Sequence, residues 1–231
     1  MRSRKIEREE WERLERALES IIPSYERVNR ILSLNLIESW WDVCARQVEG
    51  CASVLEQGCG TGCLSVRIRS EGHVCTDPSA PMLRRARERT KNSRRYVRCV
   101  AESLPFRDGS FEAVCSSFAF RDFRDKQRTF EEAYRVLESG GKLVIAEISK
   151  TNRAGAALIF NYFRLAVPVV SKVVSPGSGR GEGGWPLLPE TYARFGFVEE
   201  YERMMCEAGF ENVRHRPMRG GFALLLTGSR P

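Results

Sequence analysis

Histidine is scarce in this sequence of 231 residues, in which His73 and His215 are the only two. The eight cysteines include no Cys-x-x-Cys pair, a spacing that many structural zinc sites use. We therefore predict no metal site. Most of the cysteines stand in apolar contexts, so we interpret them as small buried side chains, with intracellular disulfides as the alternative if the source is a hyperthermophile.

An apolar leader is also lacking, because the stretch from Arg2 to Arg16 is densely charged. We therefore expect no secretory signal peptide and a cytoplasmic location. The most apolar stretch is 154–174, and four residues in it suit a bilayer poorly: Asn161, Arg164, Pro168 and Lys172. A charge at mid-bilayer is costly, so we interpret this stretch as an amphipathic segment that covers a pocket. Peripheral contact with a membrane surface, at its inner face, is the alternative.

Lysine is scarce too, since nearly all of the 37 basic residues are arginine, and the net charge is +7. Such a charge is compatible with an anionic partner such as RNA or a lipid surface. We favour an arginine-rich solvated surface, and we interpret the basic run over 84–98 as an exposed helix face. We expect no nucleic-acid partner.

Apolar periodicity divides the chain into a helical N-terminal part and an alternating remainder. Residues 1–48 are predicted to form a helical cap, with one helix over 3–20 and one or two more over 24–48. From residue 52 onward, predicted strands alternate with predicted helices, which is typical of a parallel, doubly wound sheet. The predicted strands cover 52–56, 73–77, 96–100, 111–116, 143–148, 213–216 and 222–227. The predicted helices cover 61–70, 81–91, 126–137 and 197–208.

Two glycine-containing stretches mark boundaries in the second half of the chain. Gly140-Gly141 is predicted to end the helix over 126–137 in the manner of a C′ cap. Residues 175–186 are predicted to form a Gly-rich mobile loop within an inserted lid, which covers 151–196. Because no linker divides the chain, we predict a single domain over 1–231.

The chain is organised around one turn, in which the apolar run Val54-Leu55 reaches Glu56 and is followed by Gly58, Gly60 and Gly62. This pattern predicts a strand, a sharp turn that lets a ligand approach the backbone, and a helix. The dinucleotide fingerprint requires G-x-G-x-x-G, whereas this loop has G-x-G-x-G with Cys63 next. The spacing favours S-adenosylmethionine (SAM), which has no pyrophosphate, over NAD or FAD. Asp77 ends a second apolar run, where a ribose is usually held.

Several segments together resemble the SAM-dependent C-methyltransferases of ubiquinone and menaquinone biosynthesis, from about residue 24 to the C-terminus. The more specific ones are the start Tyr25-Glu26-Arg27-Val28-Asn29, the pair Trp40-Trp41 after Ser39, and the segment Ser117-Phe118-Ala119-Phe120-Arg121-Asp122. The others are the glycine loop, Asp77 with Met82-Leu83, the stretch 101–106, the stretch 134–137 and the stretch 147–150. The resemblance implies an α/β fold with a mostly parallel Rossmann-like sheet of the class I methyltransferase type.

The chain departs from the family pattern at several positions. Glu56 replaces the usual Asp, Val100 stands where the family has Asn near the adenine, and Asp122 replaces Asn. Trp185, Leu188 and Thr191 only partly keep a Tyr-x-Tyr-Leu-x-x-Ser signature. These departures bear on the methyl acceptor more than on the cofactor.

The resemblance, with the chemistry of SAM, implies a cofactor role for ten residues. Gly58, Gly60 and Thr61 approach the methionyl part, and Glu56 takes the ammonium directly or through water. Asp77 accepts the ribose hydroxyls, unless it only caps the helix after Pro78 and Ser79. The adenine side is assigned to Met82, Val100, Ala101 and Glu102, and Ser117 closes the pocket.

Three further residues are implied in catalysis on a lipophilic quinol. A free phenol has a pKa near ~10, so the site must supply a base or stabilise the phenolate. Arg121 is the candidate cation near the developing oxyanion, unless it only pairs with Asp122 or Asp125. Tyr25 is expected to hydrogen-bond the substrate, and Asp122 either acts as general base or fixes Arg121.

Three other functions remain open at this stage. They are methylation of another small molecule on the same fold, methylation of RNA, and SAM binding without catalysis. The RNA alternative lacks the Asn/Asp-Pro-Pro-aromatic motif, because the corresponding site is Ser117-Phe118-Ala119-Phe120. A homodimer is also left open.

Overall fold

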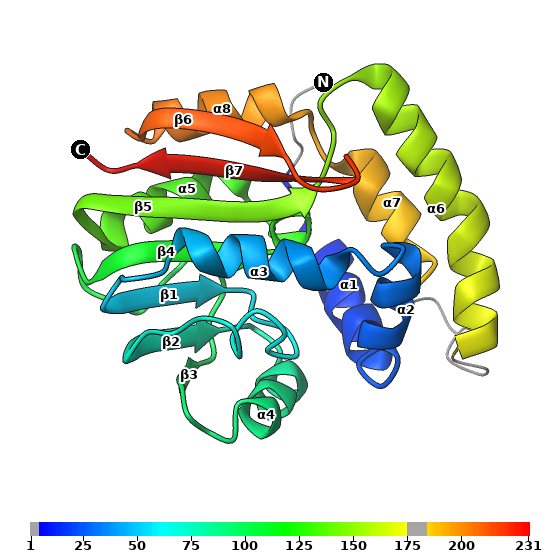
Figure 1. Cartoon of the computed structure of the whole chain (residues 1–231), viewed down its shortest axis with the longest axis horizontal. Helices are drawn as coiled ribbons and strands as arrows, with labels where there is room; N and C mark the ends of the chain where they lie inside the picture. The colour runs from blue at the N-terminus through cyan, green and yellow to red at the C-terminus, as the bar shows by residue number, and fades with distance from the viewer. Residues whose placement is uncertain (1–4, 175–183) are drawn as a thin grey trace.

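The computed structural model describes residues 5–174 and 184–231, and its centre is a seven-stranded sheet with the order β3-β2-β1-β4-β5-β7-β6 (Figure 1). The first five strands run parallel, whereas β7 is antiparallel to both β5 and β6. The strands are β1 Ser53–Gln57, β2 Gly72–Thr76, β3 Arg95–Val97, β4 Phe111–Ser117, β5 Leu137–Ile148, β6 Glu211–Pro217 and β7 Ala223–Ser229. The prediction of a mostly parallel, doubly wound sheet is therefore confirmed.

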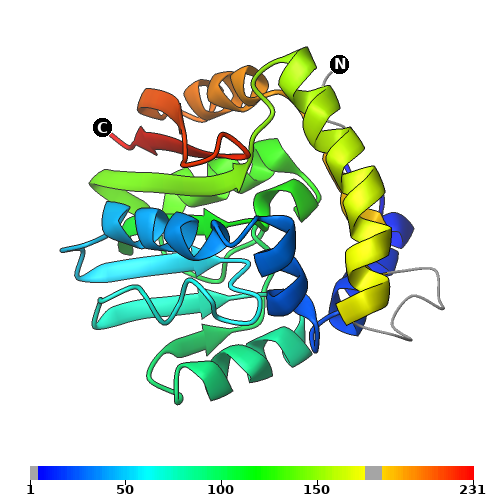
Figure 2. The same cartoon turned by 45° about the vertical axis from the view of Figure 1, so that its right-hand side comes forward.

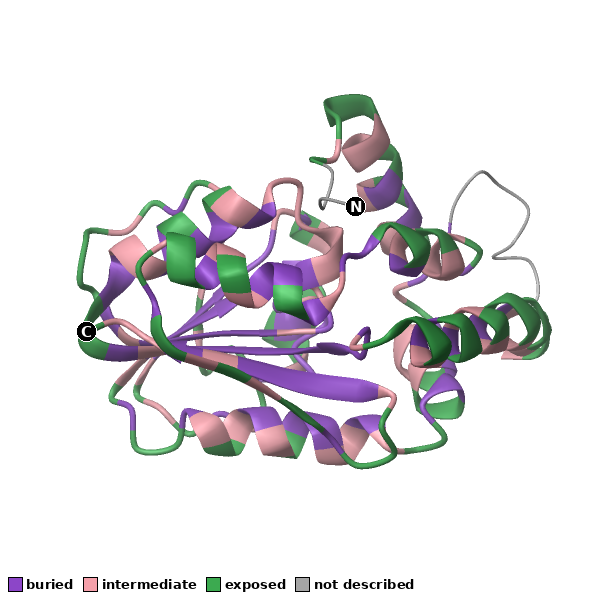
Figure 3. Cartoon of the chain, turned by 90° about the horizontal axis from the view of Figure 1, so that it is seen from above, coloured by how far each residue is buried: buried purple, intermediate pink, exposed green. Residues whose placement is uncertain are grey.

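Helices cover both faces of this sheet. The helix α3 (Ile37–Gln47) packs on one face, α5 (Lys126–Val136) and α8 (Val198–Glu207) pack on the other, and α4 (Ala80–Arg89) lies at the β3 end (Figure 1). Seen from above, the buried positions of the helices face the strands (Figure 3). Two clusters of buried apolar side chains form the core between the sheet and its helices, one around Trp40 and Val54 and one around Leu55 and Phe130.

Four further helices gather beyond the carboxyl ends of the parallel strands (Figures 1 and 2). They are α1 (Arg8–Ser20), α2 (Tyr25–Leu32), α6 (Arg153–Val174) and α7 (Leu187–Arg194). The strand order reverses between β1 and β4, and open α/β sheets bind ligands in the crevice at such a point. Of the predicted loop over 175–186, residues 175–183 lie outside the described residues.

The helix predicted over 61–70 is not formed, and these residues make turns instead. Gly62 has φ +79°, which a right-handed helix does not allow. In a helix the Arg67 N–H would donate to the Cys63 carbonyl, but here it donates to Leu64 O at 2.8 Å, and the Arg67 guanidinium takes the Cys63 carbonyl. The side chain of Arg67 therefore replaces the helical bond.

The predicted C′ cap at Gly140-Gly141 is also wrong. The helix α5 ends at Val136 with an extended Leu137, so both glycines lie inside β5. The pairing of β4 with β5 shifts register there, and Gly140 has φ +81° and donates its N–H to Arg230 O at 2.8 Å. The glycines thus form a bulge at the start of the strand.

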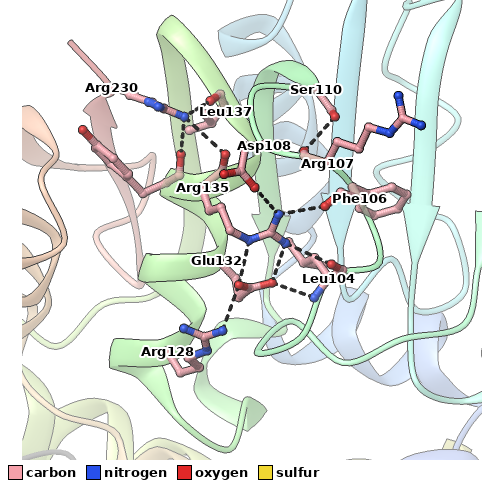
Figure 4. Close-up of polar contacts among 11 residues, drawn as sticks. Leu104, Phe106, Arg107, Asp108, Ser110, Arg128, Glu132, Arg135, Leu137 and Arg230 are labelled. Atoms are coloured by element: carbon pink, nitrogen blue, oxygen red, sulfur yellow. Dashed lines mark hydrogen bonds and ion pairs between the residues drawn. The ribbon is translucent and has the colours of Figure 1, made fainter.

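The turn after β3 is tied to α5 by one arginine (Figure 4). The Arg135 guanidinium donates to Leu104 O at 3.0 Å and to Phe106 O at 2.8 Å. It also pairs with Glu132, which in turn accepts the Leu104 N–H at 2.8 Å. This network fixes the segment that leads away from Ala101 and Glu102, and it gives the stretches 101–106 and 134–137 a common structural purpose.

Candidate functional site

A cavity of about 1000 Å³, its open mouth included, lies at the carboxyl ends of β1 and β4. All but one of the residues predicted from the sequence as site residues line it. They are Tyr25, Glu56, Gly58, Gly60, Thr61, Asp77, Met82, Val100, Ala101, Glu102, Ser117 and Asp122. The exception is Arg121, which lines two smaller chambers that also border Tyr25.

The glycine loop shapes the floor of this cavity. A Cβ on Gly58 would lie 2.6 Å from the Ala119 Cβ, so this glycine lets the loop pack against the chain after β4. Gly60, in contrast, has nothing within 4 Å of its ideal Cβ position, so it leaves open space for a ligand. Both residues have positive φ, a conformation in which other residues are strained.

Asp77 joins the glycine loop to the start of α4. Its Oδ2 accepts the Gly60 N–H and its Oδ1 accepts the Ser79 N–H, both at 2.9 Å. Burial raises the pKa of Asp77 to about 6, despite these two hydrogen bonds. The N-cap of α4 is Ser79, whose Oγ accepts from Met82 N, so Asp77 is not the residue that caps this helix.

Glu56 borders the cavity but is only 2% exposed, and one of its oxygens is already hydrogen-bonded within the protein. Its Oε2 accepts from Ser65 Oγ at 2.6 Å, lies 3.0 Å from His73 Nε2 and is 3.7 Å from Cys75 Sγ. Burial alone would lower the pKa of His73, but hydrogen bonds to Cys75 and Glu56 outweigh it and raise this pKa to about 9. Glu56, His73 and Cys75 also bring one potential metal-ligand atom each to within 4.8 Å of the others. This grouping could not be predicted from the sequence, because two strands contribute to it.

Several buried polar atoms near the cavity have no partner among the described residues. They include Ser117 Oγ, Asp122 Oδ1 and Arg121 Nε. Such atoms are costly unless a ligand or water satisfies them, so they are consistent with a polar ligand at this edge. Phe118, between them, has φ +55°, a conformation that is strained for an aromatic residue.

Arg121 is held by Glu147, a residue that the sequence analysis did not single out as a partner. Arg121 Nη1 donates to Glu147 Oε1 at 2.8 Å and to Phe118 O at 2.9 Å, and Nη2 lies 3.6 Å from Asp122 Oδ2. The side chains of Arg121 and Glu147 are 8% and 1% exposed. Burial alone would lower the pKa of Arg121, but the negative charges of Asp122 and Glu147 outweigh burial and raise this pKa above its usual value. The guanidinium therefore stays charged.

Asp122 and Tyr25 complete the polar group. Burial raises the pKa of Asp122, although Arg121 acts in the opposite direction. Burial also raises the pKa of Tyr25 to about 12, so this phenol stays protonated at neutral pH. Tyr25 stacks on Trp185 with ring centroids 6.0 Å apart, and it borders the large cavity and both smaller chambers.

One of the smaller chambers, of about 490 Å³, is mostly apolar. It lies between Arg121 and the α2–α6 pair, and its wall includes Leu32, Ile37, Phe163 and Phe222. Trp40 lines it as well, whereas Trp41 lines the large cavity, so the two tryptophans serve both packing and the site. The other chamber is lined in part by Trp185, Leu188 and Thr191, the residues of the partly kept signature.

The helix α1 supplies residues that the sequence analysis missed. Trp11, Leu14, Glu15 and Leu18 line the large cavity, although the sequence analysis treated this helix only as part of a cap. Their apolar spacing was visible, but nothing in it distinguished a cavity wall from an ordinary helix interface. Glu102, which was predicted to contact adenine, also accepts the Arg124 and Asp125 N–H groups, so it has a structural role in the adjoining loop.

The family model and the curated relatives that match this chain all describe methyltransferases of one family. A family model described as the ubiE/COQ5 methyltransferase family matches residues 6–230. A Geobacter protein (strain M21) named "Ubiquinone/menaquinone biosynthesis C-methyltransferase UbiE" is 31% identical over 235 residues, which is 96% of this chain and 98% of that protein. A Thermus thermophilus "Demethylmenaquinone methyltransferase" is 31% identical over 223 residues, 91% of this chain and 98% of that protein.

Solved structures agree on the fold. A Thermotoga maritima SAM-dependent methyltransferase, described as a possible histamine N-methyltransferase, has a TM-score of 0.67 at 20% identity. The match covers 94% of this chain and 99% of that one. Sequence identity this low shows a common class I methyltransferase fold and says nothing of the acceptor.

Proposed function

The chain belongs to the ubiE/COQ5 methyltransferase family, and we propose that it transfers a methyl group from SAM to a ring carbon of a prenylated, demethylmenaquinol-like quinol. It is a SAM-dependent methyltransferase by family and by fold. The observation that carries the proposal for the acceptor is the position of Arg121 and Tyr25. Tyr25 borders both the large cavity and an apolar chamber, and Arg121 lines that chamber, so together they offer a polar edge to an aromatic ring whose apolar tail occupies the chamber.

The large cavity suits SAM. Gly60 leaves room for a ligand against the loop backbone, and the Ser117 hydroxyl, which also lines the cavity, has no partner within the described ranges. Asp77 is proposed to accept the ribose hydroxyls, and Met82 to pack on the adenine. With Glu56 Oε2 already bonded to Ser65 and His73, we propose that Glu56 contacts the ammonium through its other oxygen or through water.

On the acceptor side, Arg121 and Asp122 have different proposed roles in the reaction. Bound SAM supplies an electrophilic methyl group. The ring carbon becomes nucleophilic when the neighbouring phenol loses its proton, and Arg121 stabilises the resulting negative charge. Asp122 is the proposed base, because its raised pKa makes it a better proton acceptor than an exposed carboxylate and its Oδ1 has no partner among the described residues. The ring proton is then lost to water while protonated Asp122 returns its proton to the oxygen, so the ring regains its aromaticity with the net release of one proton. S-adenosylhomocysteine would be the second product.

Tyr25 is proposed to position the acceptor. Its phenol is protonated at neutral pH, so it can donate a hydrogen bond to a quinol oxygen while its ring stacks on Trp185. Holding the ring carbon in line with the methyl group supplies much of the rate enhancement. A cytoplasmic location remains a prediction from the sequence, and a homodimer remains an alternative.

Calorimetric titration with SAM, followed by transfer of labelled methyl groups to demethylmenaquinol, tests this function. We expect saturable SAM binding and label in the quinol product. SAM binding without transfer to any quinol would overturn the proposal and favour either a different acceptor or a non-catalytic role.

A further inference from the structure

Large apolar side chains are exposed mainly in one region of the molecule. Of the seven such residues in the described chain, four lie on α6: Leu158, Leu165, Val169 and Val173, each between 63% and 74% exposed. Ile31 and Leu34, at the end of α2, are two of the remaining three. The helices α2 and α6 pack together, and Tyr162 Oη donates to Leu32 O at 3.0 Å. Figure 2 shows α6 along the outer side of this group.

The exposed residues of α6 form a stripe. At about 100° per residue, positions 158, 165, 169 and 173 fall on one side of a helix. The opposite side, with Ala156, Ile159, Phe163 and Val167, is buried against the protein. The charges on α6 are Arg153, Arg164 and Lys172, and the helix contains no Asp or Glu. An apolar stripe bordered only by positive charge is typical of helices that lie in the interface of an anionic membrane.

By length and composition α6 could also cross a bilayer. Two observations argue against that orientation. The buried side packs on the neighbouring helices, where Phe163 contacts Tyr192 of α7 with ring centroids 5.7 Å apart. Arg164, near the middle of the helix, is exposed and would sit near the bilayer centre. Lying flat, the helix can keep Arg164 at the headgroups while the stripe enters the acyl region.

We propose that the stripe of α6, with Ile31 and Leu34 beside it, docks the enzyme on an anionic phospholipid surface. The apolar chamber next to Arg121 is walled by Leu32 and Phe163, which belong to the same two helices. A prenyl tail can therefore pass from the membrane between α2 and α6 to the site. This inference rests on the proposed function for its substrate, but the docking itself does not depend on it.

A second copy of this chain is the main competing occupant of the stripe. Two stripes facing each other would bring Arg164 and Lys172 near the same positive groups of the other copy, with no acidic residue of α6 to offset them. Anionic lipid headgroups supply the opposite charge. The charges thus favour a membrane over self-association.

Sedimentation with phospholipid vesicles tests the docking. The full chain is mixed with vesicles of phosphatidylcholine alone or with phosphatidylglycerol added. We expect binding to the anionic vesicles, and a decrease of roughly tenfold or more in the variant Leu165→Glu/Val169→Glu, which places two charges in the stripe. Arg164→Gln/Lys172→Gln is expected to weaken binding to the anionic vesicles only. Val66→Glu is the matched control, because Val66 is the one exposed large apolar residue of the described chain that lies neither on α6 nor at the end of α2. This variant should bind vesicles like the wild type.

Two readouts separate docking from catalysis. With a quinol that has a short, water-soluble side chain, Leu165→Glu/Val169→Glu should turn over like the wild type, whereas with a long-chain quinol in vesicles it should be slower. Equal vesicle binding by the wild type and this variant would overturn the proposal. So would a wild-type dimer that this variant converts to a monomer. Wild-type vesicle binding without methyl transfer to either quinol would refute the function and leave the docking intact.

Discussion

Arg121 provides the sharpest test of the acceptor side. The simple variant Arg121→Ala would leave the Glu147 carboxylate, which is 1% exposed, buried without its partner. Losing one member of a buried pair costs about 3–5 kcal/mol, enough to confuse loss of folding with loss of catalysis. The double variant Arg121→Gln/Glu147→Gln removes both charges, and a glutamine at 121 retains a donor for Phe118 O.

We expect this double variant to lower kcat by roughly 10²–10³, the usual effect of removing a donor that stabilises a developing oxyanion. The affinity for SAM should change less than about threefold, because Arg121 does not line the large cavity. Calorimetry gives the Kd, methyl transfer at saturating SAM gives kcat, and thermal unfolding controls for folding. Glu147→Gln alone, which keeps the cation, should fall between the wild type and the double variant. A folded double variant with wild-type turnover would refute the role of Arg121.

The cofactor side gives three further predictions. Asp77→Ala should weaken SAM binding by roughly 10² or more by calorimetry, since it removes charged hydrogen bonds to the ribose and frees the loop; unchanged affinity would contradict this. Because burial raises the pKa of Asp77 to about 6, SAM affinity should fall as the pH falls below 6, and Asp77→Asn should remove that dependence. Gly58→Ala should cost roughly 1–3 kcal/mol in the free energy of unfolding, because its Cβ would lie 2.6 Å from Ala119. Gly60→Ala should cost less by urea denaturation, since its φ is positive but no atom lies within 4 Å.

The sheet and the cofactor loop could be predicted from the sequence because local patterns determine them. The alternation of apolar runs with helical periodicity predicts a parallel, doubly wound sheet, and the spacing of Gly58, Gly60 and Gly62 predicts the turn. The prediction of a helix over 61–70 failed because a side chain competed with the backbone: the Arg67 guanidinium donates to the Cys63 carbonyl, four residues earlier, that a helix would have used. Helix propensities do not account for a side chain that competes with the backbone for a carbonyl oxygen.

Contacts between residues that are far apart in the chain could not be predicted from the sequence. Pairing with Asp122 or Asp125 was the alternative to a catalytic role for Arg121. Asp122 does lie 3.6 Å from Arg121, yet the closest acidic partner is Glu147, 26 residues away on β5. Likewise the apolar pattern of α1 predicted a helix, but it could not show that Trp11 and Leu14 face the cofactor cavity. The exposure of the α6 stripe also depends on which side of the helix finds a partner, which only the packed structure shows.

The position of the transferred methyl group tests the account most directly. The enzyme is incubated with demethylmenaquinol and SAM that carries a ¹³C-methyl group, and the product is analysed by NMR. The account predicts one labelled methyl group on a ring carbon next to a hydroxyl-bearing carbon. Label on a quinol oxygen, or no label in the quinol while SAM is bound, would contradict it.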